Sequence, residues 1–95
     1  MKRIVKMTFR PDTVGEFLTV FEENCRAITA FDGCRSVELL RSIQEPNTFF
    51  TLSEWDSEDD LNAYRNSQLF SEVWAKTKAL FTERANAWSL NTVER

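Results

Sequence analysis

The segment 48–60 constrains the fold most, because an apolar strand pattern in it passes directly into an acidic helix start. Residues 48–55 are rich in β-branched and aromatic types, which favour a strand. Successive side chains of a strand point to opposite faces. Large apolar groups fall on both faces: Phe50 and Leu52 on one, Phe49 and Trp55 on the other. We therefore expect a central strand of a sheet, covered on both sides.

A helix is expected to begin at Ser57, immediately after this strand. The Ser57 hydroxyl can cap a backbone N–H, and Asp60 follows at the spacing of a capping box. Glu58 and Asp59 fall in the first turn, where the helix dipole favours anions. The pattern therefore predicts a direct connection from strand to helix.

Another strand and helix are predicted before this segment. Residues 3–10 alternate between two faces, and Pro11 ends the strand. The more apolar face carries Val5, Met7 and Phe9. Thr13 and Glu16 match a capping box, and an amphipathic helix of about 16–18 residues follows. Its apolar stripe is formed by Val14, Phe17, Leu18, Phe21, Cys25 and Ile28.

A hairpin connects this helix to the central strand. Gly33 can adopt the left-handed conformation that ends a helix. The next strand spans 34–44, and a tight turn at 45–47, with Pro46 inside it, leads into strand 48–55. One face of strand 34–44 carries Val37, Leu39 and Ile43.

Two short helices and a last strand complete the pattern. Beyond Ser57, the first helix carries Leu61 and Tyr64, and residues 66–67 predict a break or a point where a new helix is capped. The second helix has side chains at helical spacing, namely Phe70, Val73, Trp74, Thr77 and Phe81. The final strand, 85–93, places Trp88, Leu90 and Thr92 on one face.

The predicted order, β-α-β-β-α-β, is that of an α+β ferredoxin-like fold with a four-stranded antiparallel sheet. Both helical segments cover one face of the sheet in this fold. The strands carry apolar residues on both sides, and an open patch of that size is unusual on a monomer. A chain of 95 residues is also short for a self-sufficient core. We expect a single domain, 1–95, whose open sheet face meets that of a second copy in a homodimer.

Composition excludes several classes of function. The chain has 12 Lys and Arg against 15 Asp and Glu, a net charge of −3, and its basic residues are scattered, which argues against nucleic acid. No apolar run approaches the length of a membrane span, and the first residues lead into a strand instead of a signal-peptide core. We expect a cytoplasmic protein that binds neither nucleic acid nor membrane.

Metal and histidine chemistry are disfavoured. The sequence has no histidine, which removes the usual transition-metal and haem ligand and the commonest general base near neutral pH. Cys25 and Cys34 match neither a zinc motif nor a known redox spacing. The acidic run 54–60 lacks the glycine and the ligand spacing of a calcium loop. We expect no bound metal and no cofactor.

Residues 3–11, 31–34, 49–61 and 63–70 together resemble the antibiotic biosynthesis monooxygenase family of dimeric α+β barrels. The most characteristic part is the strand followed by Trp-x-Ser-x-x-x-Leu. The resemblance implies the same fold and dimer. It leaves the activity open, because the superfamily contains cofactor-free oxygenases of polyketide phenols and quinols, haem-degrading oxygenases and proteins without an assigned activity.

Two departures from the family pattern bear on activity. Family members commonly have a histidine in the helix after the tryptophan and another before a phenylalanine, and here Tyr64 and Leu69 hold these places. The haem-degrading branch uses a histidine to hold iron and an asparagine in the first strand, and this chain has neither. We therefore expect no haem degradation, and proton abstraction from a quinol needs another group.

A cofactor-free oxygenase needs a pocket for an electron-rich ring, a group that orients or deprotonates its hydroxyl, and exclusion of water. In this fold the pocket lies between helices and sheet. Tyr64 is a candidate catalytic donor to an oxyanion, and Asn24 is a second, because its amide falls on an apolar helical stripe. The candidate substrate contacts are Trp55, Trp74, Phe21 and Phe70. The alternative is that Asn24 lies in water and the rings are ordinary core.

The leading hypothesis is a cofactor-independent monooxygenase that oxidises a small phenol or quinol with O₂. Its partners are then a small aromatic molecule and a second copy of the chain. One alternative is a non-catalytic ligand-binding or stress-related dimer of the same fold. Another is a purely structural protein whose pocket is filled by its own side chains. A pocket group perturbed enough to act as a base would distinguish the first two.

Overall fold

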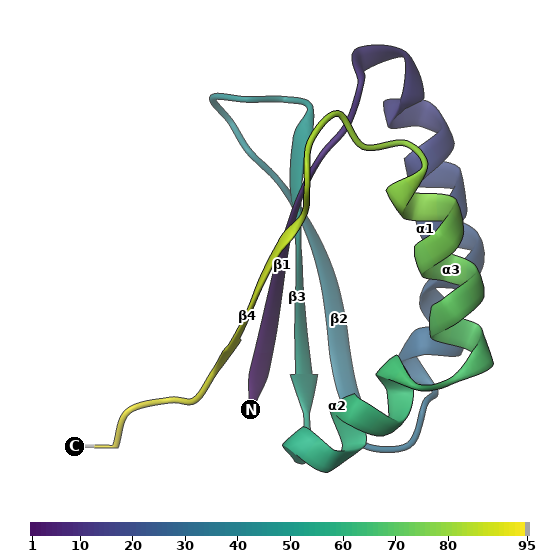
Figure 1. The fold of residues 1–95 in the computed structure, drawn as a ribbon. Helices are drawn as coiled ribbons and strands as arrows, with labels where there is room; N and C mark the ends of the chain where they lie inside the picture. The colour runs from purple at the N-terminus through teal and green to yellow at the C-terminus, as the bar shows by residue number, and fades with distance from the viewer. Residues whose placement is uncertain (95) are drawn as a thin grey trace.

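The computed structural model describes residues 1–94, and in them four antiparallel strands form one sheet (Figure 1). The chain runs through β1 (Lys2–Thr8), the 3-10 helix η1 (Pro11–Thr13), α1 (Val14–Thr29), β2 (Cys34–Arg41), β3 (Thr48–Trp55), α2 (Glu58–Arg65), α3 (Gln68–Lys78) and β4 (Asn86–Leu90). The strands lie in the order β2-β3-β1-β4. The predicted α+β ferredoxin-like fold is confirmed.

β3 is the interior strand that the sequence predicted. It pairs with β2 on one side and with β1 on the other. Phe49 and Trp55 point toward the helices, and each is only 2% exposed. The Trp55 backbone also fixes the start of the chain, because its N–H donates to the Met1 carbonyl (2.9 Å) and its carbonyl accepts from the Met1 amino group (3.0 Å). One strand therefore organises both halves of the sheet.

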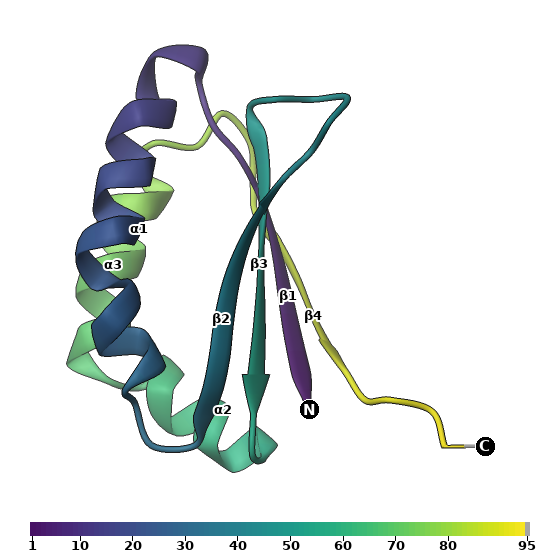
Figure 2. The ribbon, with the colours of Figure 1, turned by 180° about the vertical axis from the view of Figure 1, so that it is seen from behind.

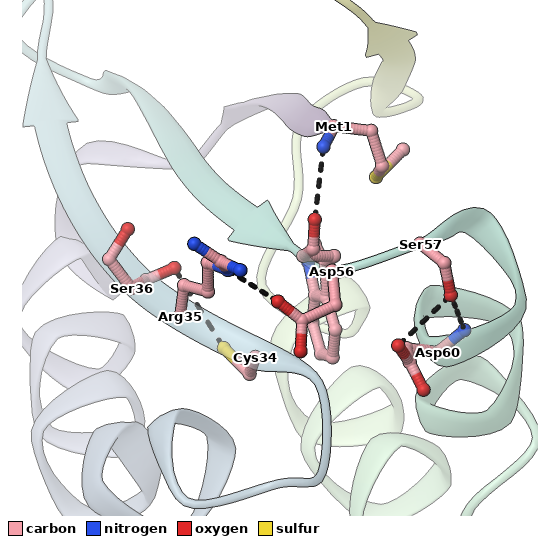
Figure 3. Close-up of polar contacts among 8 residues, drawn as sticks. Met1, Cys34, Arg35, Ser36, Asp56, Ser57 and Asp60 are labelled. Carbon is pink, nitrogen blue, oxygen red and sulfur yellow. Dashed lines mark hydrogen bonds and ion pairs between the residues drawn. The ribbon is translucent and has the colours of Figure 1, made fainter.

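Figure 3 shows the connection from β3 to α2. The Ser57 hydroxyl accepts a hydrogen bond from the Asp60 backbone N–H (3.1 Å) and donates one to the Asp60 carboxylate (2.9 Å). Arg35 of β2 forms an ion pair with Asp56, just before the cap. The predicted helix start at Ser57 is confirmed, and the adjacent strand holds it in place.

The starts of the other two helices differ from each other. The predicted break before α3 is confirmed, and the Ser67 hydroxyl caps α3 by accepting from the Phe70 N–H (3.1 Å). The predicted capping box at Thr13 is wrong. The Thr13 hydroxyl instead donates to the carbonyls of Arg10 and Leu80, both at 3.0 Å. Thr13 therefore ties the start of α1 to the segment after α3.

The two long helices, α1 and α3, lie side by side over one face of the sheet (Figures 1 and 2). Two buried apolar clusters fill the layer between helices and sheet. In one, Phe9 stacks on Phe17 with ring centroids 4.1 Å apart. In the other, Trp55 stacks on Tyr64 at 5.2 Å. The core thus has two centres along the strands.

The opposite face of the sheet carries apolar side chains that no element of the described chain covers. The strand register aligns Leu52, Ile4 and Trp88 in one row across β3, β1 and β4, and Leu40 of β2 lies on the same face. Trp88 is 46% exposed and Leu40 is 42% exposed. The turn at 42–47 and the segment after β4 also project on this side (Figure 1).

Besides Phe9, which follows the end of β1 at Thr8, three predicted residues lie outside their expected elements. β2 ends at Arg41, because the Ser42 hydroxyl accepts from the Glu45 N–H and starts the turn, and Ile43 is therefore 93% exposed in that turn. α3 ends at Lys78, and Phe81 pairs with Phe9 in an isolated bridge. The third residue, Thr92, falls after the end of β4 at Leu90.

Across residues 1–94, no helix combines the length and the apolarity that crossing a membrane requires.

Gly33 provides a stability test of the turn between α1 and β2. Its φ is +84°, where side chains are strained, and an added Cβ would collide with the Asp60 side chain. We expect Gly33→Ala to lower the free energy of unfolding by about 1–3 kcal/mol, measured by urea denaturation. The matched control is Gly15→Ala, since nothing lies within 4 Å of an added Cβ there. That change should be neutral or stabilising by up to about 1 kcal/mol. Equal stability of the two variants would contradict the assigned turn.

Candidate functional site

A cavity of about 320 Å³ lies between the helices and the sheet. Side chains from β1, α1, β2, β3, α2, α3 and β4 line it. Five of the six residues that the sequence singled out are in this lining: Trp55, Tyr64, Trp74, Phe21 and Phe70. The structure therefore brings together side chains from four separate elements, β3, α1, α2 and α3.

Aromatic rings form one wall of the cavity. Trp55 stacks on Tyr64 at 5.2 Å, and the Phe70 ring meets Tyr64 edge-on at 5.3 Å. Phe70 in turn stacks on Trp74 at 5.8 Å, with the planes only 9° apart. The Trp55 indole N–H already donates to the Ser53 hydroxyl (2.9 Å). Trp55 therefore offers an apolar surface to a ligand and no hydrogen bond.

Tyr64 offers a free hydroxyl in this wall. The residue is 9% exposed, and its hydroxyl makes no hydrogen bond to any residue from 1 to 94. No fully buried side-chain N or O atom in these residues lacks a partner, so the unbonded hydroxyl keeps some accessible surface. Burial raises the pKa of Tyr64 from 10.0 to about 12, and the nearby Cys34 thiol adds to the rise. The phenol is therefore neutral near pH 7 and suited to donate a hydrogen bond, not to accept a proton.

Asn24 does not reach the cavity. Its side-chain amide donates to the Val20 carbonyl of the same helix (2.8 Å), and Asn24 is not among the described residues that line the cavity. Asparagine amides bond locally to a backbone carbonyl when one is within reach. Helical spacing placed Asn24 on the apolar side of α1, but it did not show that the amide would turn back onto its own helix.

Five polar residues in the lining were not among the predicted site residues: Arg3, Thr51, Ser53, Arg65 and Thr77. All of them except Arg65 had a detectable signal, and Thr77 already stood in the predicted helical stripe. Arg3 shares the strand face of Val5 and Met7, and Thr51 shares that of Phe49 and Trp55. Both faces were predicted correctly, and only the polar members of each were passed over.

The opening of the cavity is marked by the exposed lining residues, which come from the end of α2 and from β4. Among the described lining residues, only Arg65 and Ala87 are exposed. Ala85 and Ala87 are small, so the part of the chain leading into β4 fills little of the space beneath the helices. The volume therefore exists because this edge lacks large side chains on the helix side.

Comparison with known proteins decides the family. A model of the antibiotic biosynthesis monooxygenase family matches residues 1–76. The chain belongs to this family. The match covers β1 through most of α3, and hence all the predicted site residues.

Solved structures of antibiotic biosynthesis monooxygenases and related proteins share the fold. One crystal structure of an antibiotic biosynthesis monooxygenase superimposes with a TM-score of 0.91 at 16% identity, covering 98% of each chain. Rv0793 from Mycobacterium tuberculosis gives 0.89 at 21% identity, covering 99% of this chain and 95% of that one. A conserved protein from Methanosarcina mazei Go1 gives 0.83 at 21%, covering 92% and 89%. At these identities the likeness concerns the fold alone.

One relative at the sequence level is a Haloquadratum walsbyi protein that is provisionally named as heme-binding, HQ_1094A. It is 27% identical to the present chain over 77 residues. The matched region is 81% of this chain but only 14% of the relative. The chain thus spans a small part of that protein.

The titration of Tyr64 tests the environment of the cavity. It is the only tyrosine, so near-ultraviolet absorbance follows it alone. We expect ionisation near pH 12 instead of 10.0. The folded state holds the phenol proton more tightly than the unfolded chain does. The protonated phenol therefore adds to the free energy of unfolding below pH 10, and this stabilisation is lost as the pH rises toward 12. Tyr64→Phe should abolish the absorbance change. A midpoint at the ordinary value in the folded protein would contradict the buried phenol.

Proposed function

We propose that this chain is a cofactor-independent monooxygenase that oxidises a small phenol or quinol with O₂. The observation that carries the proposal is the cavity, which combines an aromatic wall with the unbonded hydroxyl of Tyr64. Flat electron-rich rings stack well on such walls. Membership of the antibiotic biosynthesis monooxygenase family supports the same reaction class.

The proposed reaction needs little from the protein. A phenol that becomes a quinone takes up one oxygen atom of O₂ and loses two hydrogen atoms, which leave with the other oxygen atom as water. The substrate supplies all the electrons. The protein's part is to hold the ring against Trp55 and Trp74, to keep water out of the interior of the cavity while leaving it at the opening, and to donate a hydrogen bond from Tyr64 to the oxygen on which negative charge develops.

A non-catalytic ligand-binding dimer is the second candidate, and one observation favours it. The described residues that line the cavity include no Asp, Glu or His, and the one acidic hydroxyl among them has a pKa raised to about 12. No lining side chain is therefore suited to remove a proton near neutral pH. In the catalytic proposal, the proton of the phenol has to leave to water.

Haem does not fit this cavity. Haem iron is usually held by a histidine, a cysteine thiolate or a tyrosinate, and a methionine such as Met7 in this lining serves as a ligand paired with a histidine. The sequence has no histidine, and the cavity lining includes neither cysteine. Tyr64 remains, but its raised pKa opposes the ionised form that binds iron. The heme-binding name of the Haloquadratum walsbyi relative therefore gives no function to this chain.

The test of the proposed activity is O₂ uptake over a panel of hydroquinones and polyphenols, with a no-protein control because quinols autoxidise. Tyr64→Phe keeps the ring and removes the donor, so kcat should fall by roughly a hundredfold. Trp74→Ala removes a stacking surface and should raise KM by about tenfold. Asn24→Ala is the matched control outside the cavity and should leave both constants unchanged.

Two results would distinguish the candidates. Saturable uptake that falls in Tyr64→Phe but not in Asn24→Ala supports the oxygenase. Uptake equal to the no-protein control, while a quinol still quenches the tryptophan fluorescence saturably, would support the ligand-binding dimer instead. The same fluorescence titration in Trp74→Ala then tells whether the ligand occupies the cavity.

We further propose a homodimer through the open sheet face. The row of Leu52, Ile4 and Trp88, with Leu40 beside it, forms an apolar surface on the side away from the helices. Such surfaces on small domains are commonly covered by a partner. Two such faces in contact would make the α+β barrel that the family resemblance implies.

Light scattering tests the dimer. We expect a mass near twice that of the 11.1 kDa chain. Trp88→Lys places a charge on the 46% exposed indole position and should weaken association by at least about tenfold. Leu18→Lys is the matched control, because Leu18 is 37% exposed on α1, away from the open sheet face. A monomeric wild-type protein, or equal effects of the two substitutions, would overturn the proposed interface.

A further inference from the structure

We propose that the ligand of the cavity is an anionic aromatic molecule, whose carboxylate or similar group is held by Arg3 and Arg65 while its ring lies against the aromatic wall. The proposal rests on the function proposed above, in that it concerns the ligand of the same cavity. It goes further by assigning a charge to that ligand and a recognition role to two arginines.

The first observation is the sign of the charge in the cavity. Arg3 and Arg65 are the only charged residues among the described residues that line it. Both are positive, although the chain as a whole carries a net charge of −3. A cavity that selected neutral quinols would need neither of them. Arginine forks match planar anions such as carboxylates through paired N–H donors.

The second observation is that these charges are not neutralised within residues 1–94. The ion pairs there join Lys2 to Glu54, Arg10 to Asp12 and Arg35 to Asp56. Arg3 donates one hydrogen bond, from Nη1 to the Ser89 hydroxyl (2.9 Å), and Arg65 makes no side-chain hydrogen bond within the same residues. A guanidinium has five N–H donors, so most remain available to a ligand.

The third observation is that the two charges disfavour each other. Arg3 is half-buried, and burial lowers the pKa of its guanidinium below the ordinary value. The charge of Arg65 lowers the pKa of Arg3 further, so the two guanidinium groups interact. An anion bound between them would offset both the burial and the repulsion.

The position of the arginines fits one orientation of the ligand. Arg65 marks the opening, and it follows Tyr64 directly along α2. Arg3 lies on the same strand face as Val5 and Met7. It is near the start of β1 and pairs with Ser53, near the end of β3. Burying a charge in the apolar interior would be costly. The anionic group therefore stays at the opening, and the ring extends inward toward Trp55.

The experiment compares two probes that do not react with O₂, 2-naphthoate and 2-naphthamide. They have nearly the same shape and differ in charge, and calorimetry gives the affinity of each for the full chain. Wild-type protein should bind 2-naphthoate at least about tenfold more tightly, as expected for hydrogen bonds between charged groups. In Arg65→Met and in the double variant Arg3→Met, Arg65→Met, this preference should fall toward unity. Arg3→Lys should keep part of it.

Arg26→Met is the matched control, because Arg26 is exposed on α1 and does not line the cavity. It should preserve the preference. Equal affinity for the two probes in wild-type protein, no binding of either, or a preference that survives in the double variant would each overturn the inference. Because the probes are not oxidised, these outcomes are independent of O₂ uptake. A protein can select the anion and still lack the activity, or oxidise neutral quinols without selecting the anion.

Discussion

The packing of Trp55 links the sheet, α2 and the cavity, and the rest of the structure depends on these links. Its backbone pairs with the first residue of the chain, and its ring is buried under α2 against Tyr64. The same ring is a wall of the cavity. Because one side chain serves both the core and the cavity, the site cannot change shape without disturbing the sheet. A stacked wall that the fold already immobilises loses little conformational entropy when a ligand binds.

The fold could be predicted from the sequence because its elements carry strong local signals. Ser57 and Ser67 cap their helices as expected, and the alternation in β3 places Phe49 and Trp55 on the helix side. The errors fall at the ends of elements, where local patterns give way to tertiary contacts. Thr13 bonds to Leu80, a residue far along the chain, and no rule based on neighbouring residues reveals such a partner.

The site was predicted less completely, and the reason is physical. Large aromatic residues can be recognised from the sequence as core or site residues, because they bury area wherever they lie. Polar residues cannot be recognised in this way, since their role depends on the group with which they form a hydrogen bond or ion pair. Asn24 found a carbonyl in its own helix, whereas Arg3 and Arg65 found no carboxylate within residues 1–94 and line the cavity. Helical or strand periodicity gives the face on which a residue lies, but not its partner.

In the proposed function, the cavity has no general base to deprotonate the phenol, and the positive charge at the opening affects how readily the phenol ionises. A phenol in the cavity would lie near two guanidinium groups, and even where an anionic group of the ligand offsets one of these charges, the remaining positive charge favours the ionised phenol. Burial among Trp55, Phe70 and Trp74 opposes ionisation, and the hydrogen bond from neutral Tyr64 favours it. Two of these three effects stabilise the anion. A cavity of this kind does not need a histidine to hold the proton, provided that water at the opening can carry it away.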